Sequence, residues 1–536
     1  MAGLVRVFCA CRSCWREGGA GAPADRWRVG VASPAEETSL LLGTAAGFAA
    51  IAGAQAADLP GKAAPAEYVR ICDTYGAGFF FIPGTDTCLR IGGFVRADYS
   101  VYLNHTSNIL AAGNNGTAGN ISNAAFDNSS AFQSRFAINF DARSNTEYGL
   151  LRSFAQFTIR RGESSGYVGS GLNSYNNNPR STLAVMDRAF IQFAGFTFGY
   201  SASFFNFYQG DVNLLGNPTT ARATGTNLLA YTASFGSGFS ATVSLEDRRI
   251  TEIGNLDAAV LGTNGSSVSL GNRPLSGLGG LTYGRNDVPD IVANLRVDQG
   301  WGSAQLMGAF RQIKDYGFAG STNTATGGTI PTAAAGDKWG YAIGAGLRLN
   351  LDMIARGDQF WLQATYADGA LGYVILNGNG DGITANRNNT SGPFNFSQAG
   401  GVVYNYRDAI VNTGLVNPAI QTSKAWGVAA GFRHFWTPNL RSSLFGTYAR
   451  VDAPLASTLP DFSLWTVGAN LVWSPVRNLD LGLEVVYGSI NRTGVNAGGA
   501  ATATSCGVGS AIVAATGACK TSDQNLYTTL RVQRNF

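Results

Sequence analysis

Hydrophobic and polar residues alternate one by one along the last segment of the chain, residues 524–536. Leu530 and Val532 fall on one side of the pattern, whereas Thr529 and Arg531 fall on the other. Because successive side chains of a strand point to opposite faces, a period of two indicates a strand. The segment is therefore predicted to be a strand with one apolar and one polar face.

The same alternation recurs along the chain and predicts sixteen strands. Each is about as long as the ten residues that a tilted strand needs to cross a bilayer. An even number of strands is typical of bacterial barrels. The predicted strands cover residues 88–103, 131–143, 147–161, 183–194, 196–201, 227–235, 238–248, 290–298, 301–314, 338–350, 357–368, 423–436, 439–452, 462–475, 478–490 and 524–536.

The connections between these strands alternate between short and long. Short ones lie at residues 144–146, 195, 236–237, 299–300, 354–357, 437–439 and 475–477. Long ones, such as 104–130, 249–289, 369–422 and 491–523, are rich in Asn, Gly, Ser and Thr. A barrel with strands running up and down places all short turns at its periplasmic end and all long loops outside. A soluble β-sandwich, the alternative all-β fold, has no reason to separate loop lengths in this way. We therefore predict an all-β, 16-stranded antiparallel transmembrane β-barrel over residues 88–536.

The composition agrees with strands that face lipid. Charged residues make up only 13% of the chain, against about 25% in soluble proteins, while Gly reaches 70 and Phe 31. No apolar run reaches the eighteen residues that a membrane-spanning helix needs. A membrane role would therefore require a barrel. The formal net charge of +4 is too small to indicate nucleic-acid binding, and we expect no nucleic-acid partner.

The N-terminal region is predicted to be a signal peptide. An apolar stretch, residues 40–54, runs into Ala54-Gln55-Ala56, which has the small-x-small form of a cleavage site. The alternative, a short buried helix, is disfavoured because the stretch lacks helix caps. A signal peptide begins with a short basic region, so we interpret residues 1–38 as an over-extended start. Residues 1–56 would then be removed, leaving 57–87 as a periplasmic N-terminal segment.

Four cysteines remain after this cleavage: Cys72, Cys88, Cys506 and Cys519. Four cysteines allow three pairings, and export favours disulfides. Proximity in sequence favours Cys72–Cys88 and Cys506–Cys519. A zinc site is the alternative, but the spacings do not form paired C-x-x-C arms and histidine is nearly absent, so we expect no metal.

The sequence contains few of the residues that a catalytic site would need. The chain has only two histidines, His105 and His434, which leaves little for a nucleophile–base pair. We therefore expect no enzyme activity and no cofactor. An energy-coupled transporter would need about twenty-two strands and a separate plug. The segment before the first strand is too short for that plug.

Two stretches resemble a known family. Residues 57–60, ADLP, and 68–99, YVRICDTYGAGFFFIPGTDTCLRIGGFVRADY, resemble the start of the alphaproteobacterial general porin family. Residues 187–208, DRAFIQFAGFTFGYSASFFNFY, resemble its fourth and fifth strands, and the final residue, Phe536, agrees with it.

The resemblance implies a trimeric outer-membrane porin, a water-filled channel for passive diffusion of ions and small hydrophilic solutes. Its partners would be outer-membrane lipid, lipopolysaccharide and further copies of the chain in a homotrimer. It also implies that the third external loop, about residues 203–223 here, folds into the lumen. This loop carries Phe204, Phe205, Phe207 and Tyr208, a cluster that would be costly in water and is expected to pack against the inside wall.

Many arginines fall on the polar faces of the predicted strands. An arginine that faces lipid costs about 2–4 kcal/mol at the bilayer midplane, so these residues should line the lumen. Selection would then be by size first and by charge second. The alternative is that the arginines pair with lumen carboxylates and stiffen the wall. The residues predicted to set the charge of the lumen and its constriction are Asp211, Arg96, Arg135, Arg188, Asp98 and Asp141. Further polar-face charges are Arg90, Arg143, Arg152, Arg160, Arg296, Arg311, Arg348, Arg433, Arg441, Arg531, Glu246 and Glu484.

Overall fold

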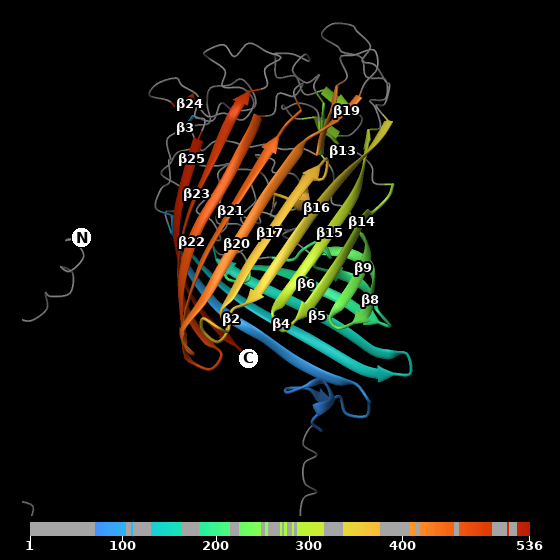
Figure 1. Cartoon of the computed structure of the whole chain (residues 1–536), viewed down its shortest axis with the longest axis vertical. Helices are drawn as coiled ribbons and strands as arrows, with labels where there is room; N and C mark the ends of the chain where they lie inside the picture. The colour runs from blue at the N-terminus through green and yellow to red at the C-terminus, as the bar shows by residue number, and fades with distance from the viewer. Residues whose placement is uncertain are drawn as a thin grey trace, which may run out of the picture. The chain divides into compact units, whose positions relative to one another are not determined.

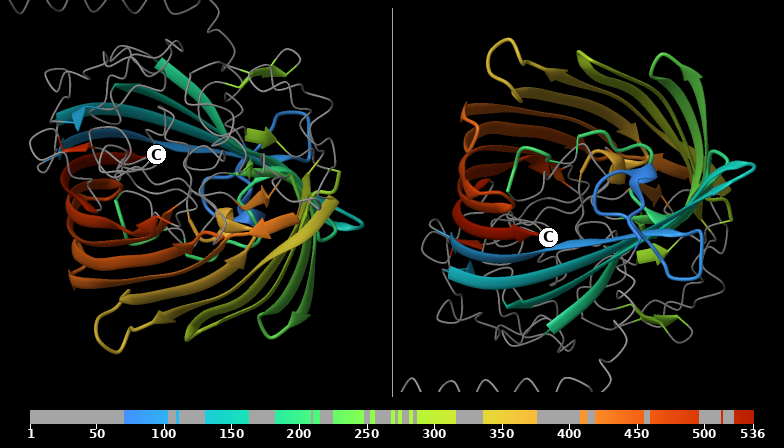
Figure 2. Two further views of the ribbon diagram at one scale, coloured as in Figure 1. Left: turned by 90° about the horizontal axis from the view of Figure 1, so that it is seen from above. Right: turned by 90° about the horizontal axis from the view of Figure 1, so that it is seen from below.

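Sixteen antiparallel strands close into a barrel in the computed structural model (Figure 1). Each strand pairs with the next barrel strand along the chain, and the last pairs with the first through Phe94 and Asn535. Figure 2 shows the resulting ring from both ends. The strands are β2 (Cys88–Tyr102), β4 (Ser130–Thr146), β5 (Gly149–Gly162), β6 (Thr182–Phe193), β7 (Phe196–Ser201), β8 (Thr226–Gly236), β9 (Phe239–Glu246), β14 (Asp290–Gln299), β15 (Gly302–Asp315), β16 (Gly336–Asn350), β17 (Gln359–Asp368), β20 (Lys424–Thr437), β21 (Leu440–Asp452), β22 (Pro460–Val476), β23 (Leu479–Val495) and β25 (Ser522–Asn535).

The structure describes most of the chain after residue 69. The described residues are 70–102, 109–110, 130–162, 182–208, 210–214, 225–247, 252–255, 268–270, 273–275, 281–283, 287–315, 336–375, 408–412, 419–454, 460–495, 512–513 and 522–536. The predicted signal peptide, His105, Cys506 and Cys519 lie outside them.

The closed 16-stranded antiparallel barrel confirms the prediction from the alternating pattern. The sixteen predicted strands correspond one for one to the barrel strands. One short turn lies wholly outside its predicted residues, because β4 extends through residues 144–146, where the turn was predicted. The turn lies at Glu147–Tyr148 instead. Thr146 stabilises it, since the Thr146 hydroxyl donates to the Gly149 carbonyl, 2.7 Å away. Other strands extend into their predicted turns by one or two residues, such as β22, which runs through Val476.

The two faces of the sheet differ as the alternation predicts. On β8, Leu229 and Tyr231 are 46% and 48% exposed, whereas Thr226, Leu228 and Ala230 are buried. On β25, Leu530 and Val532 are likewise exposed, while Thr529 and Arg531 are buried. We call the face that carries Thr529 and Arg531, together with the matching residues of the other strands, the polar face.

The residues before β2 form a small cluster closed by a disulfide. A 3-10 turn, η1 (Asp73–Tyr75), and the short strand β1 (Phe80–Phe81) lie at the end of the barrel that carries the short turns (Figure 1). Cys72 and Cys88 form a disulfide, as predicted. The guanidinium groups of Arg90 and Arg143 lie over the Phe79 ring, 5.5 and 4.9 Å from its centroid.

Shorter elements lie in the connections, and the alternating pattern did not predict them. They are β3 (Ile109–Leu110), β10 (Glu252–Asn255), β11 (Val268–Leu270), β12 (Arg273–Leu275), β13 (Leu281–Tyr283), η4 (Leu371–Tyr373), β18 (Ala409–Asn412), β19 (Ala419–Thr422) and β24 (Ile512–Val513). No helix in the described part of the chain is long and apolar enough to cross a membrane.

Candidate functional site

The segment that follows β7, residues 202–214, packs its aromatic side chains against the barrel. We call it the anchored segment. It opens with a local turn, in which the Phe205 N–H donates to the Ser203 hydroxyl, 3.1 Å away. Phe205, Phe207 and Tyr208 are buried. The aromatic cluster therefore contacts protein rather than water.

The start of the anchored segment is bonded to polar side chains of three strands. The Phe204 N–H donates to Glu246 Oε1 on β9, 2.9 Å away. The Phe204 carbonyl accepts from Asn294 Nδ2 on β14 (2.7 Å) and from Gln305 Nε2 on β15 (3.3 Å). Both backbone groups of Phe204 are thus satisfied by the polar face.

Its middle is held around Tyr208. The Tyr208 N–H donates to Gln363 Oε1 on β17, 2.7 Å away, and its ring stacks on Trp361 with the centroids 5.7 Å apart. The Tyr208 hydroxyl donates to Asn213 Oδ1, 3.1 Å away. Burial, and next the charge of Asp211, raise the pKa of Tyr208. The phenol therefore stays neutral and remains a donor.

The end of the segment is bonded to three of the last strands in the chain. The Val212 carbonyl accepts from Asn470 Nδ2 on β22, 2.8 Å away. The Leu214 N–H donates to Glu484 Oε2 on β23, 2.6 Å away, and the Leu214 carbonyl accepts from Arg531 on β25. The anchored segment, which follows β7, is thus bonded to strands that range from β9 to β25 in chain order.

Glycines on the polar face leave room for these side chains. A Cβ added at Gly431 on β20 would lie 2.5 Å from both Tyr208 Oη and Val212 Cγ2. One added at Gly482 on β23 would lie 2.8 Å from Leu214 Cδ1. The segment approaches the strand backbone closely because these positions carry no side chain.

The two predicted wall aspartates are held in ion pairs. Asp98 accepts two hydrogen bonds from Arg531, at 2.6 and 3.0 Å. Asp141 is buried and accepts from both Arg143 and Arg152, with the closest contacts at 2.8 and 2.9 Å. Asp98 therefore pairs with an arginine of the neighbouring strand β25, whereas Asp141 pairs with Arg143 of its own strand and with Arg152 of the neighbouring strand β5.

The predicted arginines are placed differently. Arg96 is the Cα partner of Arg135, and Arg135 is the partner of Arg160, so three arginines stand side by side on β2, β4 and β5. Arg96 donates to Gln533 Oε1, 2.8 Å away. Arg188 is exposed on β6 and lies outside this row. The row joins two of the predicted residues and leaves out the third.

Asp211 is exposed in the anchored segment, and its backbone carbonyl accepts from Arg433. The amide side chains that hold the segment, Asn294, Gln363 and Asn470, were not singled out from the sequence. Their only signal was a polar residue at a polar-face position, which many wall residues share.

The described residues contain no group of three or more His, Cys, Asp or Glu that could hold a metal ion. His434 Nδ1 lies 2.7 Å from Asp358 Oδ2, where β20 meets the turn before β17. His434 directly follows Arg433 on β20, whose side chain donates to the carbonyl of Asp211 in the anchored segment.

A closed barrel with an exposed apolar face and a charged polar face defines the class of outer-membrane channels. Residues 57–511 match the porin subfamily, and the chain belongs to this family. It is a general outer-membrane porin, a non-enzymatic channel for passive diffusion of ions and small hydrophilic solutes.

Individual proteins agree with this assignment. Porin Omp2b of Brucella suis biovar 1 is 32% identical over 350 residues, which cover 62% of this chain and 84% of that protein. Porin Omp2b of Brucella neotomae is 35% identical over 280 residues, which cover 51% and 66%. The outer membrane channel DcaP of Acinetobacter baumannii shares the fold, with a TM-score of 0.52 and 14% identity over 85% of this chain and 99% of that one.

Proposed function

We propose that the anchored segment folds into the lumen and forms the narrowest part of the channel. The observation that carries this proposal is the series of hydrogen bonds from Glu246 on β9 to Arg531 on β25, all made by residues 204–214. A segment bonded to polar-face residues on strands so far apart in the barrel would have to cross the space that the strands enclose.

We further propose that the row of Arg96, Arg135 and Arg160 attracts anions. Like charges directly opposite each other destabilise a strand pair, so a row of three arginines favours anions or water beside it. Asp98 and Asp141 contribute little free negative charge, because each is held in an ion pair. Asp211 on the anchored segment would oppose the row and create a transverse field at the constriction.

Single-channel recording in a planar bilayer tests the constriction. Deleting residues 206–214 should raise conductance while the barrel still assembles. Unaltered conductance after this deletion would mean that the anchored segment is not the narrowest point.

Reversal potentials test the charges separately. Replacing Arg96, Arg135 or Arg188 by Ser should move selectivity toward cations, and Asp211→Asn should move it toward anions. Arg534→Ser is the matched control, because Arg534 lies on the exposed face with Val532. If Arg135→Ser shifts the reversal potential no more than Arg534→Ser does, the arginine row does not set selectivity.

Two further expectations stay predictions. The family match begins at residue 57, directly after the predicted cleavage site, and N-terminal sequencing of the purified barrel should find Ala57.

The barrel should assemble as a homotrimer in contact with outer-membrane lipid and lipopolysaccharide. Phe132, 72% exposed on β4, offers apolar surface for such contacts. Migration of unheated protein at three times the mass of the heated form would support the trimer.

A further inference from the structure

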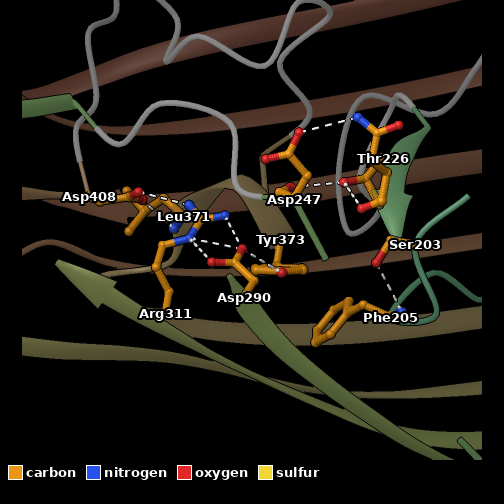
Figure 3. A network of polar contacts seen from close by, with 10 residues as sticks. Ser203, Phe205, Thr226, Asp247, Asp290, Arg311, Leu371, Tyr373 and Asp408 are labelled. Carbon is orange, nitrogen blue, oxygen red and sulfur yellow. Dashed lines mark hydrogen bonds and ion pairs between the residues drawn. The ribbon is translucent and has the colours of Figure 1, made fainter. Parts of the chain in front are cut away.

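A second segment packs against the start of the anchored segment. Residues 369–375, which we call the buried turn, follow β17, and their Leu371 and Tyr373 are fully buried. The ring of Tyr373 contacts the ring of Phe205, with centroids 4.7 Å apart and planes tilted by 50°. Figure 3 shows Tyr373 and Phe205 close together, with the charged cluster on the other side of Tyr373.

Gly369 starts this turn. Its φ of +71° is one that glycine adopts without strain, and its N–H donates to the Ser423 carbonyl, 2.8 Å away. A Cβ at this position would lie 2.7 Å from Ile313 Cδ1. The chain therefore turns tightly at the end of β17, beside the start of β20.

A buried cluster of charges fixes the turn to the wall. Arg311 on β15 is bonded to Asp290 at 2.6 Å and to Asp408 at 2.9 Å. The second oxygen of Asp408 accepts from the Leu371 N–H, 2.8 Å away. The Tyr373 hydroxyl donates to Asp290, also at 2.8 Å. Figure 3 shows these four contacts converging from separate parts of the chain.

The same cluster borders the anchored segment. Asp290 is the Cα partner of Glu246 in the pairing of β14 with β9. Glu246 accepts from the Phe204 N–H, and the adjacent Phe205 carries the ring that contacts Tyr373. The buried turn and the anchored segment are therefore attached to neighbouring charged residues and to each other.

Such an arrangement favours one geometry. Removing Arg311 would leave the buried carboxylates of Asp290 and Asp408 without this cation, which is strongly unfavourable. Loss of Asp408 would remove the acceptor of the Leu371 N–H and one of the two ion-pair partners of Arg311, which would keep its ion pair with Asp290.

We infer that Arg311, Asp408 and Tyr373 are positioning residues that hold the anchored segment in place through the buried turn. This inference deepens the proposed constriction and rests on it for any consequence in conductance. Tyr373 and Asp408, which lie in the long connection after β17, thus help to position the anchored segment, which follows β7.

Hydrogen exchange measured by mass spectrometry on the assembled barrel tests the inference directly. Tyr373→Ala and Asp408→Asn should each speed amide exchange in residues 203–208 by about tenfold, as expected for the loss of a hydrogen bond to a charged group. Exchange in the strands should stay unchanged. Asp461→Asn is the matched control, because the Asp461 carboxylate also accepts a backbone N–H, from Ala453 at 2.7 Å. Tyr373→Phe removes only the hydroxyl and serves if Asp408→Asn fails to assemble.

Unchanged exchange in residues 203–208 in Tyr373→Ala and Tyr373→Phe would overturn the inference, as would equal acceleration in Asp461→Asn. Conductance of the same variants separates the two proposals. Faster exchange with a higher or noisier conductance supports both. Faster exchange with wild-type conductance supports the positioning role and contradicts the constriction.

Discussion

The backbone N–H of Leu214 donates a hydrogen bond to the carboxylate of Glu484, which lies 270 residues farther along the chain. Glu484 is fully buried on β23, and the same oxygen accepts from Asn470 Nδ2 on β22, 3.1 Å away. One carboxylate therefore connects the end of the anchored segment to two strands.

Replacing Glu484 by Gln should loosen the end of this segment. The substitution keeps the size of the side chain, but it removes the charge and turns one acceptor oxygen into a donor. A hydrogen bond to a charged group contributes about 1.5–3 kcal/mol. We expect more current noise in the open channel and a selectivity moved toward anions, both measured in planar bilayers.

Asp480→Asn is the control for this variant. Asp480 lies on the same strand but is bonded to Arg441 and Ser474, at 2.9 and 2.6 Å, and not to the anchored segment. It changes the charge equally. If Asp480→Asn produced the same current noise as Glu484→Gln, the contact with Leu214 would not be responsible.

Gly431→Ala should displace the middle of the anchored segment. The new methyl group would lie 2.5 Å from Tyr208 Oη and Val212 Cγ2, closer than a Cβ can approach. Overpacking of this kind costs about 1–3 kcal/mol. We expect an assembled barrel with altered conductance, measured on single channels.

Gly308→Ala provides the comparison. A Cβ at Gly308 would meet only the Ala342 carbonyl, at 3.8 Å, so the same methyl group is tolerated there. Wild-type conductance is expected for Gly308→Ala. Wild-type conductance for Gly431→Ala as well would show that the segment does not rest on this glycine.

The barrel could be predicted from the sequence because each strand carries its own alternation of apolar and polar residues. In residues 524–536 the alternation of Leu530 and Val532 with Thr529 and Arg531 is local information, and short turns between such strands leave few pairings. The charged face was predictable for the same reason. An arginine such as Arg531 is costly in lipid and so must lie on the other face.

The contacts that hold the site could not be predicted in this way. The partners of Asp408 and Leu214 are set by tertiary packing between segments far apart in sequence, which no local period encodes. The wall aspartates show the same limit. Asp98 and Asp141 were predicted as lumen charges, but parity alone did not reveal that Arg531 and Arg152 pair with them.

The disulfide between Cys72 and Cys88 should protect the segment before β2. It closes a loop over 16 positions, which stabilises by about 3 kcal/mol in the chain-entropy account. Cys72, Phe79 and Cys88 are buried together. In the Cys72→Ser, Cys88→Ser double variant, chymotrypsin should cleave near Phe79, while wild-type protein stays intact at the same enzyme concentration.

Thiol labelling gives an independent test of the same bond. Neither Cys72 nor Cys88 should react with an alkylating reagent until reductant is added. The predicted partners Cys506 and Cys519 should behave in the same way. Labelling of Cys72 in unreduced native protein would show that this bond is absent in the membrane.

The last residue, Phe536, is paired with β2 next to the point where the barrel closes. The Phe536 N–H donates to the Gly93 carbonyl at 3.0 Å, and the Phe536 carbonyl accepts from the Gly93 N–H at 3.1 Å. Its ring stacks with Phe136, with the centroids 6.2 Å apart. A Cβ at Gly93 would lie 2.9 Å from Phe536 Cζ and would also meet the Ala137 carbonyl.

Closure of the barrel should therefore depend on both residues. Deleting Phe536 removes two backbone hydrogen bonds, each contributing about 0.5–1.5 kcal/mol, together with the ring contact. Phe536→Ala removes the ring contact alone, so we expect less folded barrel in the deletion than in Phe536→Ala, measured as the heat-modifiable band on a gel.

Gly93→Ala should also lower the folded fraction, because its methyl group would collide with backbone. Gly92→Ala should not, since its nearest neighbour is the end of the Asn139 side chain, 3.1 Å away. Equal folded fractions in Gly92→Ala and Gly93→Ala would mean that the close approach at Gly93 does not control closure.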